Sequence, residues 1–297
     1  MVADRGLGTV LASFGRSALV DSDGTLLRCA FLGRKLRVVC GDSVAWCCPN
    51  AAQDPAVESV QARRNLIERI DSRGRPESVA ANVDRLGIVV APEPEPDWFL
   101  VDRYWAGAGL KDLDAIIIVN KADRDIEAVQ LQLEEYKRLG LVCVEVSCVS
   151  GRGIPQLREL LANTVTMLVG QSGVGKSSLV NALAPQAEAL TAELTRDAEG
   201  RHTTTTARRY ALDANTAIID APGVRDFAPP NSILRAAERG FVEIHTRSSG
   251  CRFNNCRHME EPGCAVRSAV LHAQISPRRY ESYRRLFRLY QKLAEDS

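Results

Sequence analysis

One ten-residue stretch constrains this chain more than any other: Val169-Gly170-Gln171-Ser172-Gly173-Val174-Gly175-Lys176-Ser177-Ser178. It follows an apolar run at 165–169 and precedes residues 179–183, whose apolar positions have helical spacing. A strand, a glycine-rich loop and a helix in this order are the context that a phosphate-binding loop requires. A chance match to G-x-x-x-x-G-K-S is the alternative, and the flanking patterns argue against it. We therefore expect a nucleotide site here.

Each part of this loop has an expected role in binding. Gly170 and Gly175 let backbone amides turn towards a polyphosphate, and the start of the following helix adds positive potential. Lys176 would reach the β- and γ-phosphates, and the Ser177 hydroxyl would bind Mg²⁺. The remaining loop residues expected to contact the nucleotide are Gln171, Ser172, Gly173, Val174 and Ser178.

The composition indicates an ordinary cytoplasmic protein of two or three domains. The chain has 297 residues, of which 45% are hydrophobic and 25% charged. A net charge of +1 excludes a protein that binds polyanions over its whole surface, so any nucleic-acid surface must be local. There is no run of 18 apolar residues, so we expect no membrane insertion. The nine cysteines are an odd number, and most lie in or beside apolar runs, as reduced thiols do.

The first part of the chain reads as a small β-barrel. Short alternating segments at 8–14, 17–21, 25–31 and 36–40 are separated by turn signals. The segment carries basic and aromatic side chains that would suit RNA by neutralising phosphates and stacking on bases, namely Arg16, Arg28, Arg34, Lys35, Arg37, Phe14, Phe31 and Trp46. An equally good interpretation is that the aromatics fill the barrel and the arginines are solvated.

The middle of the chain alternates strands and helices. Residues 49–78 read as a polar connection, and we place a domain boundary near Glu77. Buried strands are then expected at 86–91, 114–119, 141–146 and 165–169, with helices at 98–107, 126–139 and from 157. This alternation predicts a doubly wound α/β domain.

The strand at 114–119 ends in Asn120-Lys121-Ala122-Asp123, a pattern that can select guanine. A carboxylate at Asp123 can accept hydrogen bonds from guanine N1–H and the exocyclic amine, which adenine does not offer on that edge. Asn120 would brace the loops and touch the base, and the stem of Lys121 would cover the ring. After the next strand, the turn containing Ser147 and Cys148 could bring backbone amides to the guanine carbonyl, although a plain strand-to-helix loop competes almost equally.

The strand at 217–220 ends in Asp220-Ala221-Pro222-Gly223. Asp220 would hold Mg²⁺ through water, and the Gly223 amide would sense the γ-phosphate. Before it, residues 203–206 are four threonines, of which Thr204 or Thr205 could complete the Mg²⁺ shell on a switch loop. The alternative is a set of β-edge residues.

The order of these motifs is unusual, because the base-reading motif at 120–123 precedes the phosphate loop. Ordinary GTP-binding domains have the phosphate loop first. A circular permutation keeps the site in space while moving the chain ends. The segment after Gly223 then leads directly into the next domain.

That next domain contains Cys251, Cys256, His258 and Cys264 within fourteen residues. Three thiolates and one imidazole match a structural zinc site, although the compact C-x-x-C spacing is absent. Residues 276–288 then read as a capped helix. Its arginines, with Tyr280, Tyr283 and Tyr290, form either an RNA-facing surface or a solvated face whose tyrosines pack on the zinc module.

Together these motifs resemble the circularly permuted, ribosome-small-subunit-dependent GTPase A family of bacteria. The likeness covers nearly the whole chain: the barrel, residues 80–84, the motif at 120–123, the phosphate loop, residues 200–205, the motif at 220–223 and residues 251–264. The resemblance implies an oligonucleotide-binding barrel (1–77), a permuted GTPase domain (78–228) and a zinc module (229–297). The resemblance also implies that the protein acts in late maturation of the 30S subunit and binds 16S rRNA. It further implies that the protein hydrolyses GTP to GDP and that the 30S subunit stimulates this reaction. The family's zinc ligands correspond to the four residues named above, and Cys148 stands where alanine is usual.

Val224 follows the motif at 220–223, where many GTPases place the glutamine that orients the attacking water. Valine cannot do this, so we expect slow intrinsic turnover, with His202 or a ribosomal group aligning the water; His202 could instead only position its loop. We expect a monomeric hydrolase. A nucleotide-gated RNA-binding scaffold is the second class of function. A phosphate-loop kinase is a third, disfavoured by the guanine-selecting motif.

Overall fold

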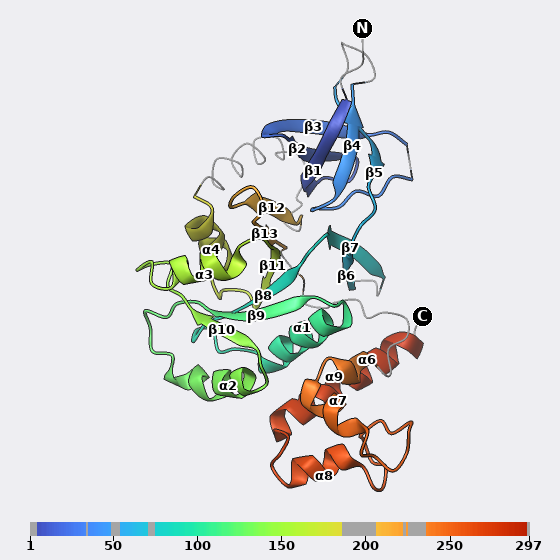
Figure 1. Cartoon of the computed structure of the whole chain (residues 1–297), viewed down its shortest axis with the longest axis vertical. Coiled ribbons are helices and arrows are strands. Elements are labelled where there is room, and N and C mark those ends of the chain that lie inside the picture. Colours follow the sequence, from blue (N-terminus) through green and yellow to red (C-terminus); the bar gives the residue numbers. More distant parts are fainter. Residues whose placement is uncertain are drawn as a thin grey trace.

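The computed structural model describes residues 5–33, 35–48, 54–70, 75–185, 206–221, 224 and 236–295. Figure 1 shows a barrel at one end, an α/β domain in the middle and a group of helices at the other end. The expected three-part architecture is therefore confirmed, as is the order of its parts along the chain.

The barrel is built from five strands: β1 (Arg5–Ser13), β2 (Ser17–Ser22), β3 (Thr25–Phe31), β4 (Ser43–Cys47) and β5 (Ala56–Val60). Their order is β1-β2-β3-β5-β4, and a pairing between β1 and β4 closes the ring. Small apolar side chains fill the interior, among them Val10, Val20 and Val57, each with none of its surface exposed. Closure removes the free strand edges that an open sheet would expose.

Two expectations for this region were wrong. Residues 36–40 form no strand beyond one isolated bridge from Cys40 to Ala80, because the chain there turns towards the hairpin below the barrel. Residues 49–78 are more than a polar connection, since they contain β5, β6 (Leu66–Ile70) and the start of β7 (Pro76–Ala81). β6 and β7 pair as an antiparallel hairpin whose outward positions are polar, which hides the strand pattern in the sequence.

The central domain has a six-stranded sheet in the order β10-β9-β8-β11-β13-β12. The strands are β8 (Arg85–Val90), β9 (Asp114–Val119), β10 (Val142–Glu145), β11 (Val165–Gly170), β12 (Arg208–Ala211) and β13 (Ala217–Asp220). All neighbours are parallel except β12, which runs antiparallel to β13 and also pairs with β1 of the barrel. The near-continuous apolar runs of β8, β9 and β11 are buried on both faces, as parallel strands require.

Helices cover both faces of this sheet (Figure 1). The helices α1 (Trp98–Leu110) and α2 (Glu127–Arg138) share one apolar cluster with alternate strand residues such as Ile88 and Ile117. On the other face, α3 (Ile154–Leu161) and α4 (Lys176–Leu183) pack against the intervening residues, such as Ile118 and Leu168. The sheet is thus doubly wound, as expected.

The C-terminal part consists of α6 (Ala236–Arg239), α7 (Val242–Ser248), α8 (Ala265–Leu271) and α9 (Pro277–Glu295) around a core of its own. It docks on α1 through a buried ionic cluster. Arg279 of α9 has no exposed surface, and it donates to Asp102 of α1 at 2.8 Å and to both carboxylate oxygens of Glu243. Arg278 pairs with Asp102 and with Glu135 of α2.

These contacts correct one reading of the last helix. Arg278 and Arg279 face α1 and α2, and Tyr283 and Tyr290 are buried in the module's core, so none of the four belongs to an RNA-facing surface. Arg285 and Arg288 remain exposed on α9. Within the described part of the chain, no helix has the length and apolar character needed to cross a membrane.

Candidate nucleotide and metal sites

The glycine-rich loop connects β11 to α4 and adopts backbone conformations that only glycine accepts readily. Gly170, Gly173 and Gly175 have φ angles of 143°, 83° and 91°. A Cβ on Gly170 would lie 2.3 Å from the Val89 carbonyl oxygen, because Gly170 ends β11 directly beside Val89 of β8. The Lys176 amine donates to the carbonyls of Gly170 and Gln171, each at 2.9 Å, and lies across the mouth of the loop.

Asn120 connects the motif at 120–123 to this loop. Its side chain is 2% exposed, and its amide donates to the Val174 carbonyl at 3.0 Å. A Cβ on Gly175 would lie 2.4 Å from the same amide nitrogen, which explains why the loop has glycine there. Lys121 adds a second connection, since its amine donates to the carbonyls of Glu93 and Gly173 at 2.7 and 2.8 Å. The two segments, about fifty residues apart in the chain, therefore form one unit.

Asp123 lies exposed at the end of the same motif, beside the turn after β10. The Ser147 hydroxyl donates to its carboxylate at 2.5 Å, and this hydrogen bond lowers the pKa of Asp123. The Cys148 thiol donates to the Asn120 side-chain oxygen at 3.4 Å, while burial raises the pKa of that thiol. Asp123 is thus an ionised hydrogen-bond acceptor at neutral pH, and the expected base-contacting residues lie together.

Asp220 ends β13, in register with Leu168 of β11. Burial raises the pKa of its carboxyl group, and the positive charges of Lys176 and Arg208 oppose that shift. Ser177 and Ser178 are exposed at the start of α4.

Several expected residues lie outside the described part of the chain: His202, Thr203, Thr204, Thr205, Pro222 and Gly223. Val224 is described. It is 4% exposed, packs in the apolar cluster under α1, and its carbonyl accepts a hydrogen bond from Tyr104 at 2.5 Å. Its side chain therefore lies in the core of the domain.

The motifs converge because β9, β8, β11 and β13 are parallel neighbours. Their carboxyl ends meet at one edge of the sheet, where ligands of open α/β sheets bind. The residues that end these strands or directly follow them at that edge are Asn120, the start of the glycine-rich loop and Asp220. The sequence did not reveal that the loop after β8 contacts this site. The Glu93 carbonyl in this loop accepts a hydrogen bond from Lys121, and Pro94 lies beside Gly173.

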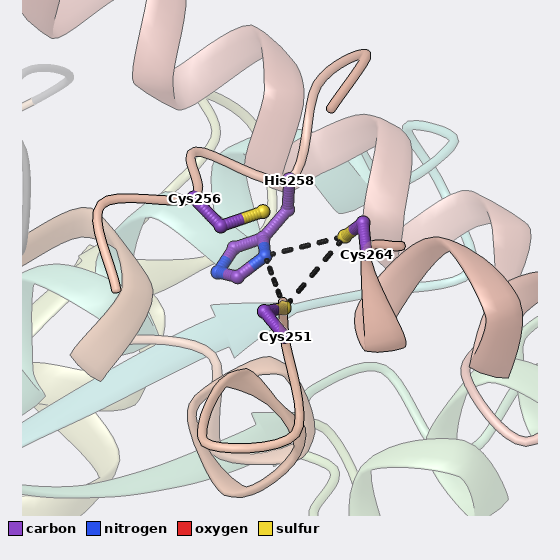
Figure 2. Close-up of side chains that lie close together, drawn as sticks. All are labelled: Cys251, Cys256, His258 and Cys264. Carbon is purple, nitrogen blue, oxygen red and sulfur yellow. Dashed lines mark hydrogen bonds between the residues drawn. The ribbon is translucent and has the colours of Figure 1, made fainter. Parts of the chain in front are cut away.

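The four C-terminal candidates Cys251, Cys256, His258 and Cys264 form one cluster (Figure 2). Their ligand atoms all lie within 4.8 Å of one another. His258 Nδ1 is 3.5 Å from the sulfurs of both Cys251 and Cys264, and these sulfurs are 3.9 Å apart. A tetrahedral zinc ion with Zn–S of about 2.3 Å and Zn–N of about 2.0 Å would require separations of about 3.8 Å between sulfurs and about 3.5 Å between sulfur and nitrogen. The cluster could therefore hold a metal ion without rearrangement of these three ligands.

Comparison with known proteins relates the chain to one family. The sequence model of the RsgA GTPase family matches residues 60–229. The small ribosomal subunit biogenesis GTPase RsgA of Pseudomonas aeruginosa is 40% identical over 285 residues, which cover 94% of this chain and 84% of that protein. The protein of the same name from Azotobacter vinelandii is 38% identical over 289 residues, with the same coverage of both chains.

Two solved structures have the same architecture. The crystal structure of YjeQ from Thermotoga maritima superposes with a TM-score of 0.72 at 28% identity, covering 96% of this chain and 98% of that one. The crystal structure of YloQ, described as a circularly permuted GTPase, superposes with a TM-score of 0.67 at 22% identity, covering 99% and 96%. At that identity the second likeness concerns the fold alone.

Proposed function

This chain belongs to the RsgA GTPase family, and from that premise we propose that it hydrolyses GTP to GDP and phosphate in late maturation of the 30S ribosomal subunit, which stimulates the reaction. The observation that carries this proposal is the hydrogen bond from Asn120 to Val174. It joins a guanine-selecting motif to a phosphate-binding loop at one sheet edge, although the two occur in reversed order along the chain.

Guanine specificity belongs to Asp123, Asn120 and Lys121. The ionised Asp123 carboxylate accepts from guanine N1–H and the exocyclic amine, and Asn120 touches the base while holding the loop. The stem of Lys121 covers the ring face. The turn at Ser147 and Cys148 supplies backbone amides to the guanine carbonyl. The hydrogen bond from Ser147 keeps Asp123 in its accepting form.

The triphosphate lies on the loop from Gly170 to Ser178. On binding, Lys176 exchanges its two loop carbonyls for phosphate oxygens. Ser177, Asp220 and a threonine, Thr204 or Thr205, hold Mg²⁺, which neutralises phosphate charge. The register of Asp220 with Leu168, two residues before the glycine-rich loop begins at Gly170, supports this assignment, since Asp220 then lies beside the phosphate-binding loop.

Intrinsic hydrolysis is slow because Val224 packs in the core and offers no polar group to a water molecule. His202 or a ribosomal group aligns the attacking water, and the Gly223 amide senses the γ-phosphate. The burial of Val224 is also the observation that favours the second candidate function, a nucleotide-gated RNA-binding scaffold whose hydrolysis is incidental.

The two other parts bind rRNA and a metal ion. Arg16, Lys35 and Arg37 are exposed on the barrel and neutralise phosphates of 16S rRNA. Phe31 and Trp46 pack against the barrel core and so contribute less to base stacking. The metal of the C-terminal cluster is zinc, held by Cys251, Cys256, His258 and Cys264 as a closed structural site.

We place the domains at 1–77, 78–228 and 229–297, with the β6–β7 hairpin crossing the first boundary. The protein acts as a monomer, and in the cytoplasm, where small subunits mature.

The proposal is tested by single-turnover GTP hydrolysis with no particle and with isolated 30S, 50S or 70S particles. We expect a slow intrinsic rate and a rise of at least about tenfold with 30S subunits alone. Equal rates under all four conditions would favour the scaffold. The same assay on His202→Ala tests the water-aligning role, and an unchanged 30S-stimulated rate would assign that role to the ribosome.

A further inference from the structure

We propose that Glu238 is the carboxylate partner of His258 in the metal site: it accepts a hydrogen bond from His258 Nε2 while Nδ1 binds the metal. This inference rests on the proposed zinc site and adds a residue that is not a metal ligand. Glu238 lies on α6, outside the segment from Cys251 to Cys264 that carries the four ligands.

The orientation of the His258 ring separates its two nitrogens. Nδ1 is the atom that faces the sulfurs of Cys251 and Cys264, as Figure 2 shows. Nε2 is buried, and among the described residues it has no hydrogen-bond partner. The Glu238 carboxylate lies 3.7 Å from Nε2, and its side chain is 17% exposed. A shift of about half an ångström would bring this pair into hydrogen-bonding distance.

Metal binding makes this contact necessary. A neutral imidazole that binds a metal through Nδ1 must carry its proton on Nε2, so that nitrogen becomes an obligatory donor. His258 is only 1% exposed, and water therefore has little access to the donor. A carboxylate in this place fixes the tautomer and the ring orientation and strengthens the ligand, and its loss typically lowers metal affinity 10- to 100-fold.

The rest of His258 is held independently of Glu238. The Tyr280 hydroxyl donates to the His258 carbonyl at 2.5 Å, and the Tyr283 ring lies 6.0 Å from the imidazole, centroid to centroid. The residue itself has a φ of 60°, an uncommon conformation for a non-glycine residue. The backbone position is thus fixed by contacts within the metal module, while the remaining polar atom of the ring is directed at α6.

The position of α6 gives this contact a wider consequence. In the described chain, α6 is the first element after β13 and Asp220, so it receives the segment that leaves the nucleotide domain. Gly240 follows it, and a Cβ there would lie 2.5 Å from Ala106 of α1. The helix α6 is therefore held between the metal ligand His258 and the helix α1, and metal binding through Glu238 fixes it there.

The test is the zinc affinity of the full-length protein, measured by competition with a chromophoric chelator. Glu238→Ala should lower the affinity 10- to 100-fold, and Glu238→Gln should lower it less, because an amide oxygen can still accept the hydrogen bond. Glu260→Gln is the matched control, since Glu260 is an exposed carboxylate of the ligand-bearing segment, and it should bind zinc like the unmodified protein. Unchanged binding of a fluorescent GTP analogue shows that each variant is folded.

A second background separates positioning of the imidazole from a general structural effect. In a His258→Cys protein the fourth ligand is a thiolate with no ring proton, so Glu238→Ala should cause no further loss of affinity there. An equal loss in both backgrounds, or no loss in either, would overturn the role of Glu238.

If the unmodified protein binds no stoichiometric zinc, the proposed zinc site itself is wrong. If the His258→Cys protein takes up no zinc, long-range ¹H–¹⁵N spectra decide, because a slowly exchanging Nε2 proton of His258 must disappear in Glu238→Ala.

Discussion

Gly175 is the residue at which backbone conformation and packing constrain the nucleotide site together. Its φ of 91° disfavours any side chain, and the position of a Cβ would be 2.4 Å from the Asn120 amide. We predict that Gly175→Ala displaces Asn120 and lowers GTP affinity at least about tenfold, because both the loop and the base-reading motif shift. Equilibrium titration with a fluorescent GTP analogue measures this.

Gly140→Ala separates the two constraints. Gly140 has a φ of 92° and no atom within 4 Å of its Cβ position, so alanine there meets the backbone strain without the collision. It should lower the free energy of unfolding by about 1–2 kcal/mol and leave GTP affinity unchanged. Equal losses of GTP affinity in the two variants would show that the contact with Asn120 is unimportant.

Base recognition by Asp123 can be tested by a substitution that reverses the preference between two nucleotides. In Asp123→Asn the side chain can donate where the carboxylate only accepts, so GTP affinity should fall by about a hundredfold or more. Xanthosine triphosphate, which has a carbonyl in place of the exocyclic amine, should then bind better than GTP. Asp112→Asn, an exposed site with a φ of 53° that asparagine accepts, is the control. If Asp123→Asn keeps its preference for GTP, the carboxylate does not read the base.

At the scale of elements, α1 joins the nucleotide domain to the metal module. Asp102 is fully buried and receives hydrogen bonds from Tyr136, Arg278 and Arg279. Asp102→Asn keeps the shape but removes the buried negative charge that Arg278 and Arg279 share, and Glu135 and Glu243 then remain as their charged partners. We therefore predict a loss at the lower end of the cost of breaking a buried ion pair, about 3 kcal/mol in the free energy of unfolding. Urea unfolding followed by the fluorescence of Trp98 and Trp105, both on α1, reports on this region.

Arg288→Ala is the matched change on α9. Arg288 is exposed, and its replacement should alter the free energy of unfolding by no more than about 0.5 kcal/mol. If Asp102→Asn and Arg288→Ala unfold at the same urea concentration, the buried ionic cluster does not hold the module on α1.

The elements also show what sequence reasoning can and cannot reach. Strands β8, β9 and β11 were predictable because each is buried on both faces and reads as a continuous apolar run. Strands β6 and β7 were missed because most of their positions are only partly buried or exposed and several carry charged side chains, such as Glu68 and Glu77. The burial of Arg279 was also unpredictable, since its partner Asp102 is 177 residues away and no local pattern links them.

The candidate site residues could be proposed from the sequence because they sit in contiguous motifs whose spacing is fixed by chemistry. The connection of those motifs through Asn120 and Gly175 followed from the expectation that parallel strand ends meet at one edge. The role of the loop at Glu93 and Pro94 was not predictable, because its contacts to Lys121 and Gly173 depend on how the loop folds over the site.

At the scale of the whole molecule, the barrel and the nucleotide domain share one continuous sheet, since β1 pairs with β12. If RNA binds on the barrel as we propose, it is connected through the backbone to the strand that precedes β13 and Asp220. We predict that replacing Arg16 and Arg37 with glutamine weakens binding to 30S subunits and makes the slope of log affinity against log salt shallower by about 2.

Arg138→Gln is the control for this experiment, because Arg138 is an exposed arginine of α2, away from the barrel. Its slope should match that of the unmodified protein. If the protein with both Arg16 and Arg37 replaced shows an unchanged salt slope, these two arginines contact no phosphate.

The central claim is that segments around residues 120, 170 and 220 together form one site for a guanine nucleotide. The most direct test is a parallel equilibrium titration of the purified protein with GTP and ATP in the presence of Mg²⁺. Because Asp123 accepts from groups that adenine lacks, GTP should bind at least about a hundredfold more tightly than ATP. Equal affinities for the two nucleotides would contradict the account.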